Sequence, residues 1–227
     1  MKHFKNFKTC VYCTAQTLAS LDETTLARDY AYLEKYVGID KVYLETYRDG
    51  TWVAIDHMKM IQNFFKKHGV EIAGGITAVT PPLEKDDAKR QRLFQTFCYS
   101  NETMRTYLKK IVTYTAELFD EIILDDFFFT SCTCDDCLRE RSNLSWAEFR
   151  SNKMIDVAEN LVLKPAKLAN PSVKVTIKYP NWRESYHETG YVPKIQPSMF
   201  DKIYTGTETR NTAHTDLLVV PGKRRNR

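Results

Sequence analysis

The sequence lacks a run of apolar residues long enough to cross a membrane. The segment Thr9–Gln16, which follows a basic start, is too short and too polar to be the core of a signal peptide. We therefore expect no membrane partner. As written, the chain is expected in the cytoplasm, and it is exported only if an N-terminal leader is missing from the sequence given.

The sequence also lacks a strong excess of one charge. Its 33 basic and 29 acidic residues give a formal net charge of +4, and the last five positions include Lys223, Arg224, Arg225 and Arg227. Without this tail the chain is neutral, so the composition gives no support for a nucleic-acid partner. We expect residues 221–227 to be a disordered basic tail.

Three common catalytic signatures are missing. No Gly-x-Gly-x-x-Gly follows the first expected strand, so a dinucleotide-binding fold lacks its phosphate cradle. No nucleophile elbow is present, and the five histidines form no cluster with the spacing of metal ligands. We therefore expect no cofactor.

What is present is an alternation of strand and helix patterns. Strands are expected at 9–12, 41–50, 70–77, 121–124, 173–180 and 201–208, and helices at 21–38, 56–69, 101–119 and 145–170. A polar insertion, Pro81–Arg92, follows the third strand. The alternation predicts a parallel sheet with right-handed crossovers.

The sheet is either wound as an open sheet or bent into a barrel. Polar residues after nearly every strand favour the barrel, because a ring-shaped site is built at the strand ends. An eight-stranded (β/α)8 barrel usually needs about 250 residues, whereas six strands are found in this chain of 227. We therefore predict an α/β fold of the (β/α)8 type, incomplete with about six units, as a single domain over residues 1–220.

The stretch Glu121–Cys137 gives the clearest indication of where an active site would lie. It begins as an apolar run, typical of a strand covered on both faces, and meets Asp125 and Asp126 where the strand should end. In a parallel barrel such acids lie on the floor of the active site. Alternatively, one aspartate caps the following turn and the other is solvated. Adjacent strand residues point in opposite directions, so only one should face the barrel axis, and we favour Asp125.

The stretch Ile123-Leu124-Asp125-Asp126-Phe127-Phe128-Phe129, the Cys-x-Cys-x-x-Cys loop and Trp146–Arg150 together resemble TIM-barrel glycoside hydrolases. The resemblance covers about residues 7 to 210, and its specific part is 121–150. It implies a catalytic barrel that acts on an oligo- or polysaccharide.

The resemblance also implies catalytic residues. In glycosidase groups whose nucleophile lies at the end of strand four, the acid/base partner comes from strand six. Asp125 or Asp126 matches the first position, and Glu208 is the acid near the second. Glycosidic cleavage needs such a pair, one carboxylic acid to protonate the leaving oxygen and one carboxylate to attack the sugar or activate water. The alternative for Glu208 is a carboxylate at the start of a helix.

Candidate sugar-binding residues also lie at the strand ends, where hydrogen-bonding groups and aromatic platforms could form a cleft. They are Glu45, Tyr47 and Arg48 after the second strand, and Lys178, Tyr179, Asn181 and Trp182 after the fifth. Each of them taken alone also fits a surface or packing role. The sequence does not indicate the oligomeric state.

The sequence is compatible with more than one role for the cysteines. Cys132, Cys134 and Cys137 could bind Zn²⁺ with a fourth ligand such as His187 or Cys98. Structural zinc sites usually contain two separated cysteine pairs, so we do not predict a metal. The loop could instead hold a disulfide if the protein is exported.

Two other functions therefore compete with a hydrolase. One is a catalytically inactive carbohydrate-binding barrel, and the other is a zinc-stabilised interaction module.

Overall fold

A computed structural model describes residues 4–80, 92–181 and 183–206. Four sequence-based predictions lie outside these residues: most of the Pro81–Arg92 insertion, Trp182, Glu208 and the 221–227 tail. Among the described residues, no helix is both long enough and apolar enough to cross a membrane.

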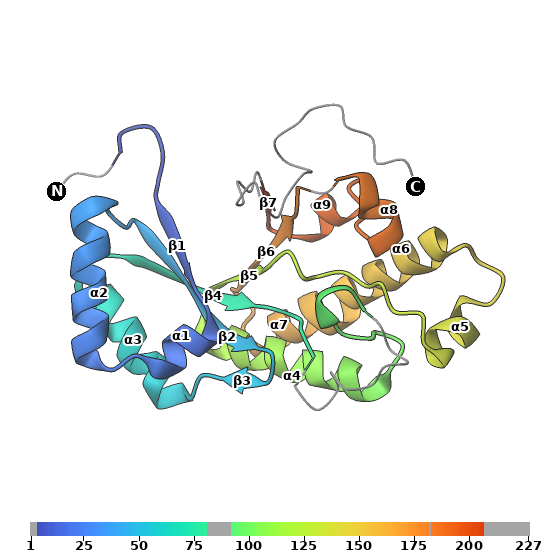
Figure 1. The fold of residues 1–227 in the computed structure, drawn as a ribbon, viewed down its shortest axis with the longest axis horizontal. Helices are drawn as coiled ribbons and strands as arrows, with labels where there is room; N and C mark the ends of the chain where they lie inside the picture. Colours follow the sequence, from blue (N-terminus) through green and yellow to red (C-terminus); the bar gives the residue numbers. More distant parts are fainter. Residues whose placement is uncertain (1–3, 81–91, 182, 207–227) are drawn as a thin grey trace.

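The described residues form one sheet with six parallel strands, and all six predicted strands are present (Figure 1). They are β1 (Cys10–Cys13), β2 (Lys41–Arg48), β4 (Glu71–Ile76), β5 (Glu121–Leu124), β6 (Lys174–Tyr179) and β7 (Lys202–Thr205). A short β3 (Thr51–Trp52) pairs antiparallel with β2.

The parallel strands lie side by side in chain order, β1-β2-β4-β5-β6-β7. A doubly wound sheet reverses its strand order at a switch point, whereas a barrel adds every new strand on the same side. Within the described residues β1 and β7 each pair with a single parallel neighbour. The architecture is therefore an incomplete (β/α)8 barrel, as the sequence predicted.

Helices pack against the outer face of the sheet and against one another. The described residues form α1 (Ala15–Ser20), α2 (Glu23–Tyr36), α3 (Ile55–Lys67), α4 (Glu102–Leu118), α5 (Asp135–Arg141), α6 (Trp146–Val157), α7 (Lys164–Ala169), α8 (Tyr186–Thr189) and α9 (Gln196–Met199). A π-helical segment, Ala158–Leu163, joins α6 to α7. In Figure 1, α2 and α3 lie beside β1 and β2, while α4 and α7 lie under the middle of the sheet.

Local signals explain where the two long helices after the insertion begin. Asn101 accepts a hydrogen bond from the Met104 backbone at the start of α4. Ser145 and Glu148 form a reciprocal capping box at the start of α6. Asn and Ser are among the residues that favour the N-cap position, and Ser-x-x-Glu is the spacing of a capping box.

Side chains alternate along the strands between the helix layer and the barrel interior. On β2, Val42 and Leu44 pack in the helix-facing core, whereas Tyr43 lies in a separate interior cluster with Ala73 and Ile123. At Gly75 a Cβ atom would lie 2.7 Å from the Tyr12 hydroxyl. The absence of a side chain at Gly75 therefore lets the Tyr12 ring cross the interior near the carboxyl ends of the strands.

The amino ends of the strands carry an ion cluster. Glu121 on β5 binds Lys41 on β2 at 2.6 Å and Lys202 on β7 at 2.7 Å. The Tyr43 and Tyr204 hydroxyls lie 2.6 Å apart nearby. These contacts connect three strands at the end of the barrel opposite Asp125.

Candidate active site

Glu45 lies at the centre of a polar network at the carboxyl ends of the strands, and its side chain is fully buried. The Tyr12 hydroxyl donates to it at 2.7 Å, the Ala15 backbone N–H at 2.6 Å, and Thr77 also donates a hydrogen bond. Arg48 supplies the opposite charge. Because these donors enclose the carboxylate, Glu45 holds its neighbours in place and is not exposed to a ligand.

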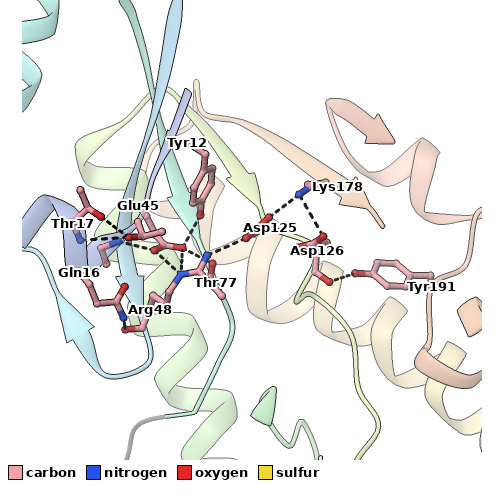
Figure 2. Close-up of polar contacts among 12 residues, drawn as sticks. Tyr12, Gln16, Thr17, Glu45, Arg48, Thr77, Asp125, Asp126, Lys178 and Tyr191 are labelled. Carbon is pink, nitrogen blue, oxygen red and sulfur yellow. Dashed lines mark hydrogen bonds and ion pairs between the residues drawn. The ribbon is translucent and has the colours of Figure 1, made fainter. Parts of the chain in front are cut away.

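Arg48 connects Glu45 to Asp125 (Figure 2). Its Nε atom lies 3.0 and 2.9 Å from the two Glu45 oxygens, and its Nη2 atom lies 3.1 Å from Asp125 Oδ2. Its guanidinium also lies over the Phe127 ring, 5.6 Å from the ring centre. The side chain is 22% exposed, so one edge of it remains accessible.

Asp125 is the first residue after β5, and its backbone N–H extends the sheet pairing to Ile76 O at 3.0 Å. Its side chain is 12% exposed and lies between two cations. Lys178 donates to Oδ1 at 3.1 Å, and Arg48 binds Oδ2. Side chains from β2 and β6 thereby fix the position of this carboxylate.

Asp126 contacts the same ammonium group, with Lys178 Nζ 3.4 Å from its Oδ2 atom. Its backbone carbonyl accepts a hydrogen bond from the Tyr191 hydroxyl at 3.0 Å. Burial raises the pKa of Tyr191 well above its ordinary value, with nearby Asp126 adding to the effect. This hydroxyl therefore remains a donor at neutral pH.

The two aspartates do not separate onto opposite faces, although strand alternation led us to expect that only one would face the axis. Lys178 lies between Asp125 and Asp126 and reaches both carboxylates (Figure 2). The reason is that the hydrogen-bonded strand ends at Leu124, and a turn closed by Phe128 N–H to Asp125 O follows at once.

Two phenylalanines lie next to this polar group. Phe127 is partly buried, and Phe94 packs edge-on against it with a ring-centre distance of 5.4 Å. Phe94 is 59% exposed, and its backbone has φ of +52°. Sequence reasoning missed Phe94, because nothing in its local pattern places it beside a strand end 30 residues away.

The other predicted sugar-binding residues are spread through the structure. Tyr47 is fully buried, and its hydroxyl donates to Val79 O at 3.0 Å. Tyr179 is also buried, and its hydroxyl donates to Gln196. Asn181 is partly exposed after β6. Glu45, Arg48 and Lys178 are thus the predicted residues that the structure brings together with Asp125 and Asp126.

Four cysteines converge in a second cluster. Cys98, from the segment before α4, joins Cys132, Cys134 and Cys137, and their sulfur atoms all lie within 4.8 Å of one another. His187, the other residue considered for this position, is exposed and lies 3.9 Å from Glu188. Cys10 and Cys13 lie on β1, away from this cluster.

Comparison with known proteins gives a consistent family match. The sequence model of a family described as probable glycosyl hydrolase, catalytic domain, matches residues 1–222. An uncharacterised protein of Saccharolobus solfataricus is 34% identical over an alignment of 230 residues, which covers 91% of this chain and 38% of that protein.

Two solved structures share the fold. The β-galactosidase from the psychrophilic Marinomonas ef1 has a TM-score of 0.65 at 13% identity, over 88% of this chain and 40% of that enzyme. The cold-adapted β-galactosidase from Rahnella sp. R3 has a TM-score of 0.63 at 12% identity, over 88% and 39%. The chain therefore spans about two fifths of the length of the proteins it matches.

Proposed function

Because the chain belongs to the family of probable glycosyl hydrolase catalytic domains, we propose that it takes part in hydrolysing glycosidic bonds at the carboxyl ends of its parallel strands. The observation that carries this proposal is the position of Asp125, held between Arg48 and Lys178 directly after the fourth parallel strand. This is the end of a barrel at which catalytic residues are found.

Asp125 takes the role of the charged carboxylate. Two cations bind its two oxygens, and a carboxylate that attacks a sugar or activates water must be ionised when the substrate arrives. The oxocarbenium-like transition state carries positive charge, which a fixed carboxylate stabilises. Asp126 shares Lys178 and supports the same charge pattern.

The proton donor must be a different acid. Both aspartates contact the Lys178 ammonium, so we assign neither of them the role of giving a proton to the leaving oxygen. Glu208, which follows the sixth parallel strand in the sequence, is the proton donor we propose. Its replacement by Gln should slow substrates with a poor leaving group far more than activated aryl glycosides, because a good leaving group departs without a proton.

The substrate class is a carbohydrate. Arg48 and Lys178 are 22% and 24% exposed and can donate further hydrogen bonds to sugar hydroxyls. Phe94 and Phe127 offer an apolar surface beside them, on which the C–H face of a sugar ring can pack. A barrel with these groups at one end provides the polar and apolar contacts that an oligosaccharide needs.

The test is turnover of a panel of aryl glycosides of both anomers and of oligosaccharides, followed by aryl and reducing-end release. D125N is expected to lower kcat at least about 10²-fold while calorimetric affinity for the sugar is retained. D126N is measured beside it, and D29N, which alters an exposed carboxylate on α2 paired with Arg28, is the control.

Two outcomes contradict the proposal. If the chain binds sugars but hydrolyses none of them, it is an inactive carbohydrate-binding barrel. If D125N and D126N both turn over at the rate of D29N, the catalytic centre lies elsewhere.

A further inference from the structure

Four thiols from two distant parts of the chain meet next to the segment that follows Asp125. Cys98 lies before α4, while Cys132, Cys134 and Cys137 lie in and after the loop that leads into α5. Cys98, Cys132 and Cys137 are buried and Cys134 is partly buried. Four convergent thiols of this kind are rare as simple core packing, because each could be replaced by an alanine or a valine.

Three of the sulfur atoms form a triangle with the dimensions of one face of a tetrahedral site, and the Cys132 sulfur lies within 4.8 Å of all three. The Cys98 sulfur lies 3.6 Å from those of Cys134 and Cys137, and the Cys134 and Cys137 sulfurs lie 3.8 Å apart. In a tetrahedral site with Zn–S bonds of about 2.3 Å, neighbouring sulfurs lie about 3.8 Å apart. A disulfide requires about 2.05 Å between two sulfurs and leaves the other thiols outside the bond.

The surroundings suit a metal bound by thiolates. The Ser100 hydroxyl lies 3.4 Å from the Cys137 sulfur and can orient it. Arg150 donates at 3.2 Å to the carbonyl of Ser131, the residue before Cys132, and brings a positive charge to the side of the cluster. Four thiolates and one Zn²⁺ carry a net charge of −2, which a nearby guanidinium partly balances.

We propose that Cys98, Cys132, Cys134 and Cys137 bind one Zn²⁺ ion in a closed structural site. Four protein ligands complete the tetrahedron, so the ion has no open position for a substrate and its role is to hold the chain. Cys98 is the ligand that sequence spacing alone could not distinguish from His187. The six cysteines of the chain thus divide into four ligands and the two thiols of β1.

The ion would connect two segments that border the candidate active site. Cys98 follows the Leu93–Gln95 turn that carries Phe94, and Cys132 ends the segment that begins at Asp125. A hydrogen bond of 2.8 Å from Leu93 N–H to the Ser131 hydroxyl already joins these segments. The metal therefore fixes Phe94 relative to Asp125, a consequence for activity that rests on the proposed function.

The first test is metal content. The chain, purified without a histidine tag, should contain about one zinc per molecule by inductively coupled plasma mass spectrometry. C98S should lose most of the zinc, while C10S, which alters an exposed thiol on β1, should keep it. Replacement of zinc by Co²⁺ should give the intense d–d bands of tetrahedral thiolate coordination, which C98S should lose.

A second measurement needs only the unaltered protein, so it remains decisive if C98S does not fold. Titration with an organomercurial should release one zinc, detected by a chromogenic chelator, as four thiols react. Zinc well below one per chain, another metal in its place, or an intact mass that reveals disulfides would each overturn the proposal. Zinc that remains in C98S would overturn it too.

Activity measurements distinguish the zinc site itself from its proposed effect on catalysis. Stripping the zinc with a chelator should lower the thermal midpoint and the glycosidase rate together. If zinc is stoichiometric but the chain hydrolyses no glycoside, the proposed function fails and the metal site stands. If the protein hydrolyses glycosides and contains no zinc, the metal site fails and the proposed function stands.

Discussion

The Arg48 guanidinium binds Asp125 at 3.1 Å although 77 residues separate the two in the chain. Arg48 ends β2 and Asp125 follows β5, so this contact crosses the mouth of the sheet. On its other edge Arg48 binds both oxygens of Glu45. The fully buried Glu45 thereby fixes the direction in which Arg48 presents its charge to the candidate catalytic carboxylate.

The first prediction concerns this bridge. R48K keeps the positive charge, but its single ammonium cannot bind Glu45 and Asp125 with the planar geometry of a guanidinium. We expect kcat to fall about 10- to 100-fold, because a misplaced carboxylate loses its alignment with the sugar, while the thermal midpoint changes little. K35R, an exchange in the last turn of α2, is the matched control. Equal kcat values for R48K and K35R would show that the bridge does not position Asp125.

The second prediction concerns Glu45. E45Q keeps the shape of the side chain but leaves Arg48 without its buried counter-charge and replaces an acceptor oxygen with a donor. We expect a loss of about 3–5 kcal/mol in the free energy of unfolding, typical of breaking a buried ion pair on one side. Denaturant unfolding measures this loss, and E117Q, at an exposed position of α4, serves as the comparison. A destabilisation below about 1 kcal/mol would mean that the network relaxes around the amide.

Much of this arrangement could be read from the sequence, for reasons that differ by residue. The strand before Asp125 could be predicted because an apolar run stops at two carboxylates. The order of the strands in the sheet could be predicted from the repeated alternation of strand and helix. Glu45 and Arg48 could be predicted as polar residues at the end of a strand. Their link to Asp125 was not, because spacing within one strand carries no information about contacts across the barrel.

Tyr47 illustrates a different limit. Strict alternation places it on the same face as Glu45, two residues earlier. In the structure the pairing of β2 with β4 shifts register between Glu45 and Tyr47, and Tyr47 turns into the core that α4 helps to form. A β-bulge inserts one extra residue into one strand, so the side chains after it point to the opposite face. The residue types around Tyr47 do not indicate such a bulge in the sequence.

The third prediction uses the ion cluster at the amino ends of the strands. Burial opposes the charge on Glu121, but hydrogen bonds from Lys202 and Lys41 outweigh it, so the pKa of Glu121 is lowered from its ordinary value of 4.5. A carboxylate with a lowered folded-state pKa stabilises the protein above its unfolded pKa and loses this contribution as pH falls through the folded pKa. The contribution of Glu121 should therefore be complete at pH 7 and decrease progressively as the pH falls below about 4.5.

E121Q should accordingly lower the stability at pH 7 by up to about 3 kcal/mol, the low end of the range for buried pairs, because Lys202 is partly exposed. The difference between E121Q and the unaltered protein should shrink as pH falls from 5 toward 3. Urea unfolding across this pH range measures both quantities. A difference that stays constant with pH would indicate a packing effect of the amide and not the loss of a charge.

The last prediction separates binding from stability at Phe94. Its ring is 59% exposed and its φ of +52° is a conformation that costs a non-glycine residue about 1–3 kcal/mol. Such strain is typical of functional positions, and the ring lies against Phe127 beside Arg48. F94G removes the strain together with the ring. We therefore expect F94G to be as stable as the unaltered protein or more so, although it loses an aromatic contact.

The same substitution should weaken sugar binding. An aromatic contact of about 0.5–1.5 kcal/mol corresponds to a rise in KM of about 2- to 12-fold, with kcat affected less because Phe94 does not touch the reacting carboxylates. F94Y keeps a ring and should restore KM, whereas L93G, at an exposed neighbour, tests whether loosening the turn is enough. If L93G raises KM as much as F94G while F94Y does not restore it, Phe94 shapes the turn and does not contact the sugar.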